Sequence, residues 1–216
     1  MQNGLRLPSG LWSRSKDLLA VSSQGLTADD IMRCFNLKPL PAEGGLWVQS
    51  YRSTDVIPGE ALPQRYPRSP RNICNAILYL LTGGSFSALH RNATDEIYHF
   101  YLGDPIEMLL LYANGSSQRI ILGQDFLDGQ QVQFTAPRGA WQGSHLLPGG
   151  RFGFCGSSMA PAFSETDWEG GVREELLAQY PQEADLIIQL THEHAIKRMD
   201  KLEWHNMKPL NGQSRN

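Results

Sequence analysis

The strongest constraint on the fold is the stretch 73–160, in which short apolar segments are separated by Gly, Asn, Asp and Pro. Segments of this kind predict short β-strands. No helical pattern of about 10 residues lies between them, which disfavours a parallel α/β sheet. Asn114-Gly115 is typical of a hairpin turn. The sequence therefore predicts an all-β sandwich or barrel, with strands over 73–82, 85–91, 96–102, 106–112, 118–122, 131–136, 141–147 and 151–159.

Helices are predicted on both sides of this strand-rich part. Thr27 and Asp30 have the spacing of a capping box at a helix start, and the helix should end near Asn36 because two prolines follow. The run 46–52 alternates and predicts a further strand. After the strands, 172–190 carries apolar residues at helical spacing. We expect one short leading helix and a helical tail around the β-domain.

We expect an N-terminal extension over 1–25, one domain over 26–190, and a helical or irregular extension over 191–216. A chain of 216 residues is long enough for one domain. Its net charge of −3 gives no basic surface for nucleic acid, and its apolar runs are too short to span a membrane. The three cysteines have no short spacing, so a reducing cytoplasm is expected. The acid-poor start keeps organellar targeting as the alternative.

The most informative stretch is 84–103, which reads Gly-x5-His-x-Asn-x3-Glu-x6-Gly with His90, Asn92 and Glu96 at its polar positions. Residues two apart share a strand face. We therefore expect Phe86 to point the same way as His90 and Asn92, and Tyr98 the same way as Glu96. If both faces look inward, an imidazole, a carboxylate, a phenol and amides meet in one hollow, which favours binding or acid–base chemistry.

The same stretch resembles the first motif of the cupin superfamily, and 137–142 resembles the second. Asn92 and Gln142 stand where metal-binding cupins have histidines. The match is closer still to a small cupin family of unknown function (domain of unknown function 985), through Glu43-Gly44-Gly45, Tyr51-Arg52-Ser53, Phe86-Ser87-Ala88, Asp95–Tyr101 and Trp141-Gln142. The resemblance implies a cupin jelly-roll β-barrel (a double-stranded β-helix) with a short N-terminal helix and C-terminal helices, paired as a homodimer.

A metal site is not favoured, although a divalent metal stays open. Amides are weak neutral donors, so the set His90, Glu96 and Gln142 predicts low affinity for a transition metal. His99 and His145 lie on opposite strand faces from these residues and are not natural replacements. No other cofactor is expected.

The expected function is binding of a small molecule, with isomerase or epimerase chemistry on a sugar or other polar carbonyl metabolite. This follows from the resemblance to metal-free cupin epimerases, in which an amide follows the histidine two places later. A non-catalytic ligand-binding or storage-like cupin is the alternative, as is a weakly metal-dependent lyase or dioxygenase. Glu43 and Arg52 line the pocket or form a structural ion pair. The predicted catalytic residues are His90 as base, Glu96 and Tyr98, and the predicted substrate-binding residues are Phe86, Asn92, Trp141, Gln142, Glu43 and Arg52.

Overall fold

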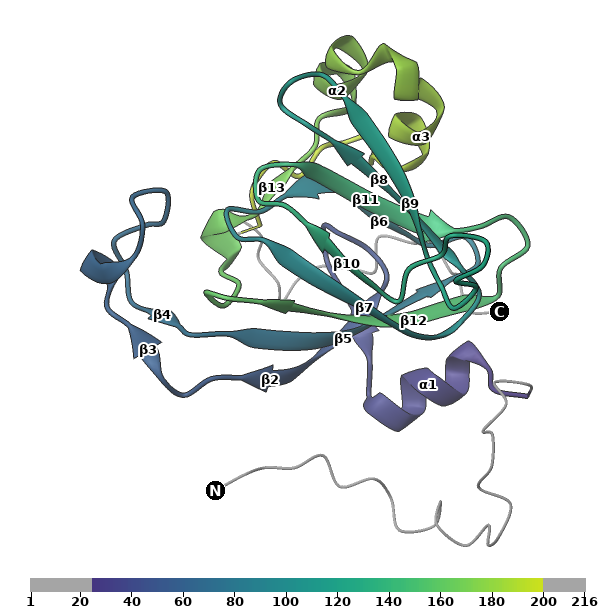
Figure 1. Cartoon of the computed structure of the whole chain (residues 1–216), viewed down its shortest axis with the longest axis horizontal. Helices are drawn as coiled ribbons and strands as arrows, with labels where there is room; N and C mark the ends of the chain where they lie inside the picture. The colour runs from purple at the N-terminus through teal and green to yellow at the C-terminus, as the bar shows by residue number, and fades with distance from the viewer. Residues whose placement is uncertain (1–24, 200–216) are drawn as a thin grey trace, which may run out of the picture.

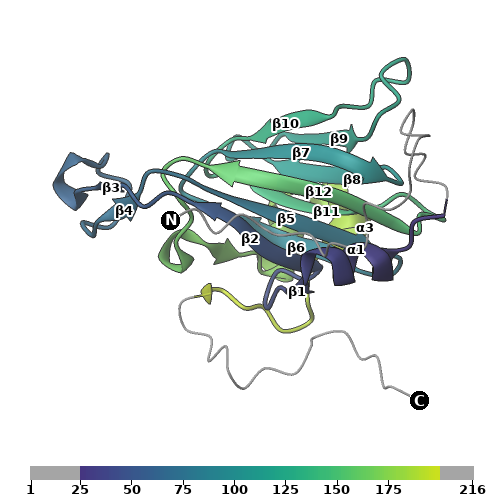
Figure 2. The same cartoon turned by 90° about the horizontal axis from the view of Figure 1, so that it is seen from below.

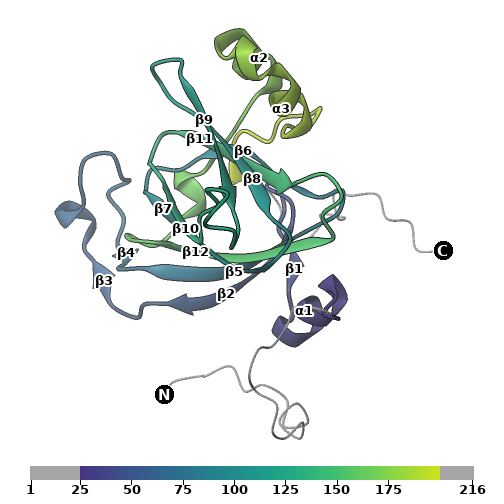
Figure 3. The ribbon, with the colours of Figure 1, turned by 45° about the vertical axis from the view of Figure 1, so that its right-hand side comes forward.

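Two antiparallel β-sheets face each other in the computed structural model, which describes residues 25–199 (Figures 1 and 3). The six-stranded sheet has the order β1-β2-β5-β12-β7-β10, and the five-stranded sheet has the order β13-β6-β11-β8-β9. The predicted all-β jelly-roll architecture is confirmed. The strands are β1 (Lys38–Pro39), β2 (Leu46–Arg52), β3 (Val56–Ile57), β4 (Arg71–Asn72), β5 (Asn75–Thr82), β6 (Phe86–Arg91), β7 (Glu96–Gly103), β8 (Ile106–Leu111), β9 (Ser117–Leu122), β10 (Gln133–Ala136), β11 (Trp141–Leu146), β12 (Phe152–Met159) and β13 (Glu169–Gly170).

Helix α1 (Ala28–Phe35) packs across one end of the outer face of the six-stranded sheet (Figure 2). The predicted capping box is present, because the Asp30 backbone N–H donates to Thr27 Oγ1 at 3.2 Å and the Thr27 N–H donates to the Asp30 carboxylate at 3.1 Å. Asn36 ends the helix in the left-handed conformation. Ile31 is buried in the same apolar cluster as Phe154 of β12, so the helix is held by its apolar face.

Helices α2 (Arg173–Gln179) and α3 (Ala184–Gln189) cover the outer face of the five-stranded sheet (Figure 3). Leu176 and Ile187 are buried there with Leu89 of β6 and Leu109 of β8. This packing explains why Leu89 and Leu109 are apolar although they lie on the outer face of the sheet.

Between the sheets, the core is apolar at one end and polar at the other. The apolar end is filled by side chains from both sheets, such as Leu81 and Phe100 opposite Met108 and Leu110. The polar end holds the residues of the motif stretch. Filling of one end confines any ligand space to the other end of the same interior.

The long Pro-containing connection predicted over 54–70 contains β3 and projects from the body as an arm, at whose base β3 pairs with β4 (Figures 1 and 2). It contributes no residue to the cavity described below. Within residues 25–199, no helix is both long and apolar enough to cross a bilayer. Most of the predicted N-terminal extension and residues 200–216 of the C-terminal extension lie outside the described part of the chain.

Candidate functional site

A cavity of about 460 Å³ opens between the sheets at the polar end of the core. A row of directly paired residues crosses four strands of the six-stranded sheet here, from Arg52 through Asn75 and Met159 to Glu96. All of them line the cavity. The next row inward is Gln49, Ile77 and Ser157, and other walls come from Leu40, Glu43, Trp47, Asn92, Met199 and the loop 163–166.

A β-bulge in β2 is the reason that Arg52 faces the cavity. The pairing with β5 shifts between Gln49 and Tyr51, so one extra residue is inserted. Strict alternation would put Tyr51 on the same face as Gln49. Instead Tyr51 is 55% exposed, and the Arg52 guanidinium donates to the Gln49 side chain at 3.1 Å, where both residues line the solvent-exposed part of the cavity.

A second bulge, in β6, corrects the prediction for Phe86. Gln142 and Ser144 of β11 pair with His90 and Ser87, which are three residues apart rather than two. Strict alternation is therefore broken between them, and the prediction that Phe86 shares a face with His90 is wrong. Phe86 packs with the outer cluster under α2 and α3 and against the His192 ring. Ser87 points to the other side, where its hydroxyl donates to the Glu43 carboxyl group at 3.0 Å.

The Glu43-Gly44-Gly45 motif brings a carboxyl group into the cavity. Gly44 and Gly45 have φ of +94° and +67°, a region that favours glycine. A Cβ on Gly44 would overlap the Phe86 carbonyl oxygen, and one on Gly45 would overlap the Tyr79 hydroxyl. The close approach is fixed by the Glu43 carbonyl, which accepts from the Ala88 N–H at 2.7 Å. The two glycines therefore let the loop lie flat against β6.

Four predicted residues meet in one hydrogen-bonded cluster at the cavity wall. Gln142 Nε2 donates to Glu96 at 2.7 Å and lies 3.2 Å from His90 Nε2, and Asn92 Nδ2 donates to Glu96 at 3.2 Å. His90 Nδ1 lies 2.8 Å from the Ala88 carbonyl, which can only accept, so Nδ1 carries a proton. The amide oxygens of Asn92 and Gln142 are buried without a partner.

The two carboxyl groups of the site have different surroundings. Glu96 accepts two amide N–H groups on one oxygen, whereas Glu43 accepts the Ser87 hydroxyl. Burial raises the pKa of Glu43, and the charge on Glu96 raises it further, against the opposing effect of His90. The distance from Glu43 Oε2 to His90 Nε2 is 3.8 Å. The two carboxyl groups therefore differ in their hydrogen-bond partners, and burial makes Glu43 harder to ionise than a carboxyl group in water.

His90 lies behind the cavity wall rather than on it. Its side chain is 1% exposed, it is absent from the lining, and Trp168 stacks on it at 5.7 Å. The groups that line the cavity are Glu43, Asn92 and Glu96, with Gln142 behind them beside His90. A ligand therefore meets the carboxyl groups before the imidazole.

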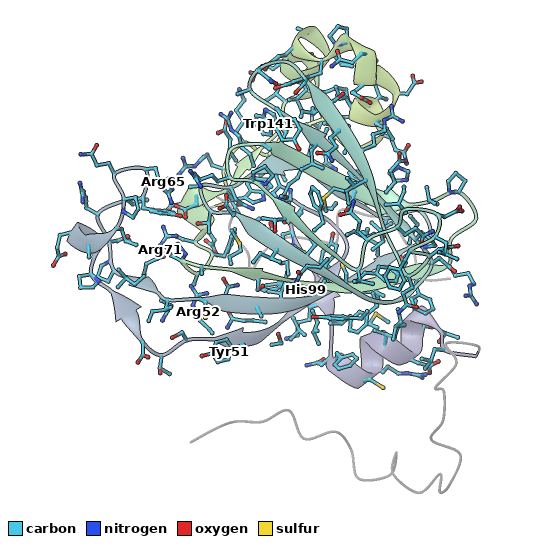
Figure 4. All side chains as sticks on the ribbon, in the orientation of Figure 1. Tyr51, Arg52, Arg65, Arg71, His99 and Trp141 are labelled. Atoms are coloured by element: carbon cyan, nitrogen blue, oxygen red, sulfur yellow. The ribbon has the colours of Figure 1, made fainter. Side chains whose placement is uncertain are left out.

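Two other predicted site residues lie away from the cavity. Tyr98 is buried in the apolar core with Phe100, and burial together with the Glu96 charge raises its pKa well above the usual value. Trp141 faces away from Gln142, towards α2 and α3, where it packs with Leu176 and Arg91 lies over its ring (Figure 4). Alternation along β11 puts it there, so the pocket placement of Trp141 is wrong. Of the two alternatives for Glu43 and Arg52, the structure shows that both line the cavity. They form no ion pair with each other, since Glu43 accepts from Ser87 and Arg52 donates to other groups.

The cluster does not fit a transition-metal centre. The atoms that Asn92 and Gln142 present to Glu96 are N–H donors, which cannot bind a cation. Among residues 25–199, no group of three or more His, Cys, Asp or Glu side chains is placed to hold a metal. His99 bonds to Ser158, and His145 to Glu107, both outside the cluster.

A family model described as "Cupin superfamily (DUF985)" matches residues 29–170. The chain belongs to this family. The cupin is similar to a crystal structure of a Shewanella oneidensis protein, with 30% identity and a TM-score of 0.69 over 78% of this chain and 99% of that one. It is also similar to a hypothetical protein from Leishmania major, with 24% identity and a TM-score of 0.70 over 78% and 100%. No curated sequence matches it.

Sequence reasoning missed several residues of the cupin's site. Trp168 lies far along the chain and reaches His90 only through the return of the segment after β12. Ser87 could not be assigned to the inner face from the sequence, because the bulge in β6 breaks the alternation between Ser87 and His90. Trp47 and Gln49 had a usable signal, because they alternate along β2, but alternation alone does not say which face is inward.

Proposed function

We propose that this cupin binds a small polar carbonyl compound in the cavity and moves a proton at the carbon beside the carbonyl, as an isomerase does. The observation that carries the proposal is the presence of two carboxyl groups, Glu43 and Glu96, with different hydrogen-bond partners on the wall of one cavity. General acid–base catalysis requires such a pair, one protonated and one ionised.

In the proposed step, the Glu96 carboxylate takes the proton from the carbon. The electron pair moves to the carbonyl oxygen, which receives the proton of Glu43, and an enol results. Glu96 then holds a proton and Glu43 is ionised. Glu96 then gives its proton to the original carbon or to the neighbouring one. Glu43 takes back a proton from the enol oxygen or, for the isomer, from the hydroxyl group on the original carbon. Both carboxyl groups are restored, so no cofactor is consumed.

His90 acts through its neighbours in this proposal. It replaces the earlier hypothesis of His90 as the contacting base, because its side chain is behind the wall. Its Nε2 faces Gln142 and the Glu43 carboxyl at 3.2 and 3.8 Å. We assign it as a positioning residue that fixes the Gln142 amide, and through it the Glu96 carboxylate.

The test is exchange of carbon-bound hydrogen for deuterium in D₂O, followed by NMR on a panel of hydroxyketones, aldoses and oxo acids. Glu96→Gln keeps the shape and removes the base, so exchange should fall about 100-fold or more. Glu60→Gln, on the exposed arm, is the matched control and should leave the rate unchanged. Equal rates in the Glu96→Gln variant would refute the proposal, and binding without exchange would favour the non-catalytic binder.

A further inference from the structure

Arg52 carries the only basic side chain among the described residues that line the cavity. Its guanidinium donates to three neutral acceptors, the Asn72 side chain at 2.8 Å, the Gln49 side chain at 3.1 Å and the Phe163 carbonyl at 3.0 Å. None of these neutralises its charge. A guanidinium has five N–H donors, so two remain, and within residues 25–199 no carboxylate pairs with it.

This arrangement differs from that of arginines with a structural role in the same chain. Arg71 is buried against Asp167, and Arg119 bonds to Glu183. Arg52 is instead held in a fixed orientation while its charge stays free. Pre-orientation lowers the entropy cost of binding, and the planar fork suits a carboxylate or phosphate.

The separation of Arg52 and Glu96 across the sheet indicates how long a ligand must be to reach both residues. The two residues end one row of paired residues, Arg52–Asn75–Met159–Glu96, three strand spacings apart. At about 4.8 Å per spacing, the Cα atoms are separated by roughly 14 Å. Both side chains line the cavity, and their hydrogen bonds go to different partners, so the guanidinium and the carboxylate are not in contact. Ile77 and Met159 provide an apolar wall along this row.

We propose that the ligand is a small organic anion, whose carboxylate or phosphate binds Arg52 while its carbonyl end reaches Glu96. This rests on the proposed function for the carbonyl end only. Glu165 also lines the mouth, and its charge reduces the affinity for anions without removing the orientation, since Arg52 alone offers donors in a fork. An apolar body between two polar ends fits the apolar wall between Arg52 and Glu96.

The test compares anionic probes with their neutral counterparts by calorimetric titration at constant ionic strength, since salt screens such pairs. The pairs are 4-oxopentanoate with its methyl ester, and dihydroxyacetone phosphate with dihydroxyacetone. One pair reports a carboxylate and the other a phosphate. We expect at least one anion to bind tenfold or more tightly than its neutral counterpart, with the difference lost in Arg52→Gln.

Arg33→Gln is the control, because it removes the same charge from the surface of α1, outside the cavity. It should keep the anion preference. Arg52→Lys, which keeps the charge without the fork, should retain part of it. Repeating the titration with Glu96→Gln separates the two proposals, because anion preference should survive there even if proton transfer is absent. Equal affinities for anion and neutral probe, binding by neither anion at 10 mM, or an unchanged preference in Arg52→Gln would each overturn the inference.

Discussion

Replacing Gly44 by alanine should separate the two reasons for glycine in the loop that carries Glu43. Gly44 has φ of +94°, and an added Cβ would overlap the Phe86 carbonyl oxygen. Gly84 has φ of +82° with nothing within 4 Å of the added Cβ. Gly84→Ala should therefore lower the free energy of unfolding by about 1–2 kcal/mol, the cost of the left-handed backbone conformation alone. Gly44→Ala has this cost plus about 1–3 kcal/mol for overlap with a backbone oxygen, which cannot rotate away.

The total expected loss is about 2–5 kcal/mol for Gly44→Ala and about 1–2 kcal/mol for Gly84→Ala. Urea denaturation of both full-length variants, followed by tryptophan fluorescence, gives the two free energies of unfolding. Near-ultraviolet circular dichroism checks that each variant starts from a folded state. Losses that agree within about 0.5 kcal/mol, the usual range for surface substitutions, would refute the reasoning, because the close approach of Gly44 to β6 would then have no energetic consequence.

Two further variants test the site and its surroundings. Burial raises the pKa of Glu43, so the native state keeps this proton at a pH where the unfolded chain has released it. The free energy of unfolding therefore falls as pH rises from about 4.3. In urea titrations, Glu43→Gln should be more stable than the parent protein at pH 8 and not at pH 4, and an equal gain at both pH values would contradict the raised pKa of Glu43. Trp141→Leu should lower the free energy of unfolding by about 1–3 kcal/mol in the same assay. It should leave the affinity for the anionic probes unchanged, since Trp141 packs under α2 and α3. A lower affinity in this variant would show that Trp141 contributes to the cavity.

Much of the architecture could be predicted because it depends on local patterns. The turn at Asn114-Gly115, the capping box of α1 and the strand segments each follow from a few neighbouring residues. The homodimer and the cellular compartment stay predictions, since they depend on surfaces and signals that the fold alone does not test.

The site was predictable in part. His90, Asn92, Glu96 and Gln142 meet because regular alternation holds on the stretches that carry them. Phe86 departs from the prediction because one inserted residue in β6 reverses the faces beyond it. Trp141 departs from it although alternation holds along β11, because the family pattern named the residue without its direction.

The sequence by itself determined the strands, the turns and which polar residues come together, because these depend on residues close in the chain. Tertiary structure decided which of them a ligand can reach. Trp168 and Glu43 arrive from opposite ends of the domain to cover His90, and the bulge in β2 turns Arg52 inward. Contacts between distant segments set burial and charge, and no local pattern records them.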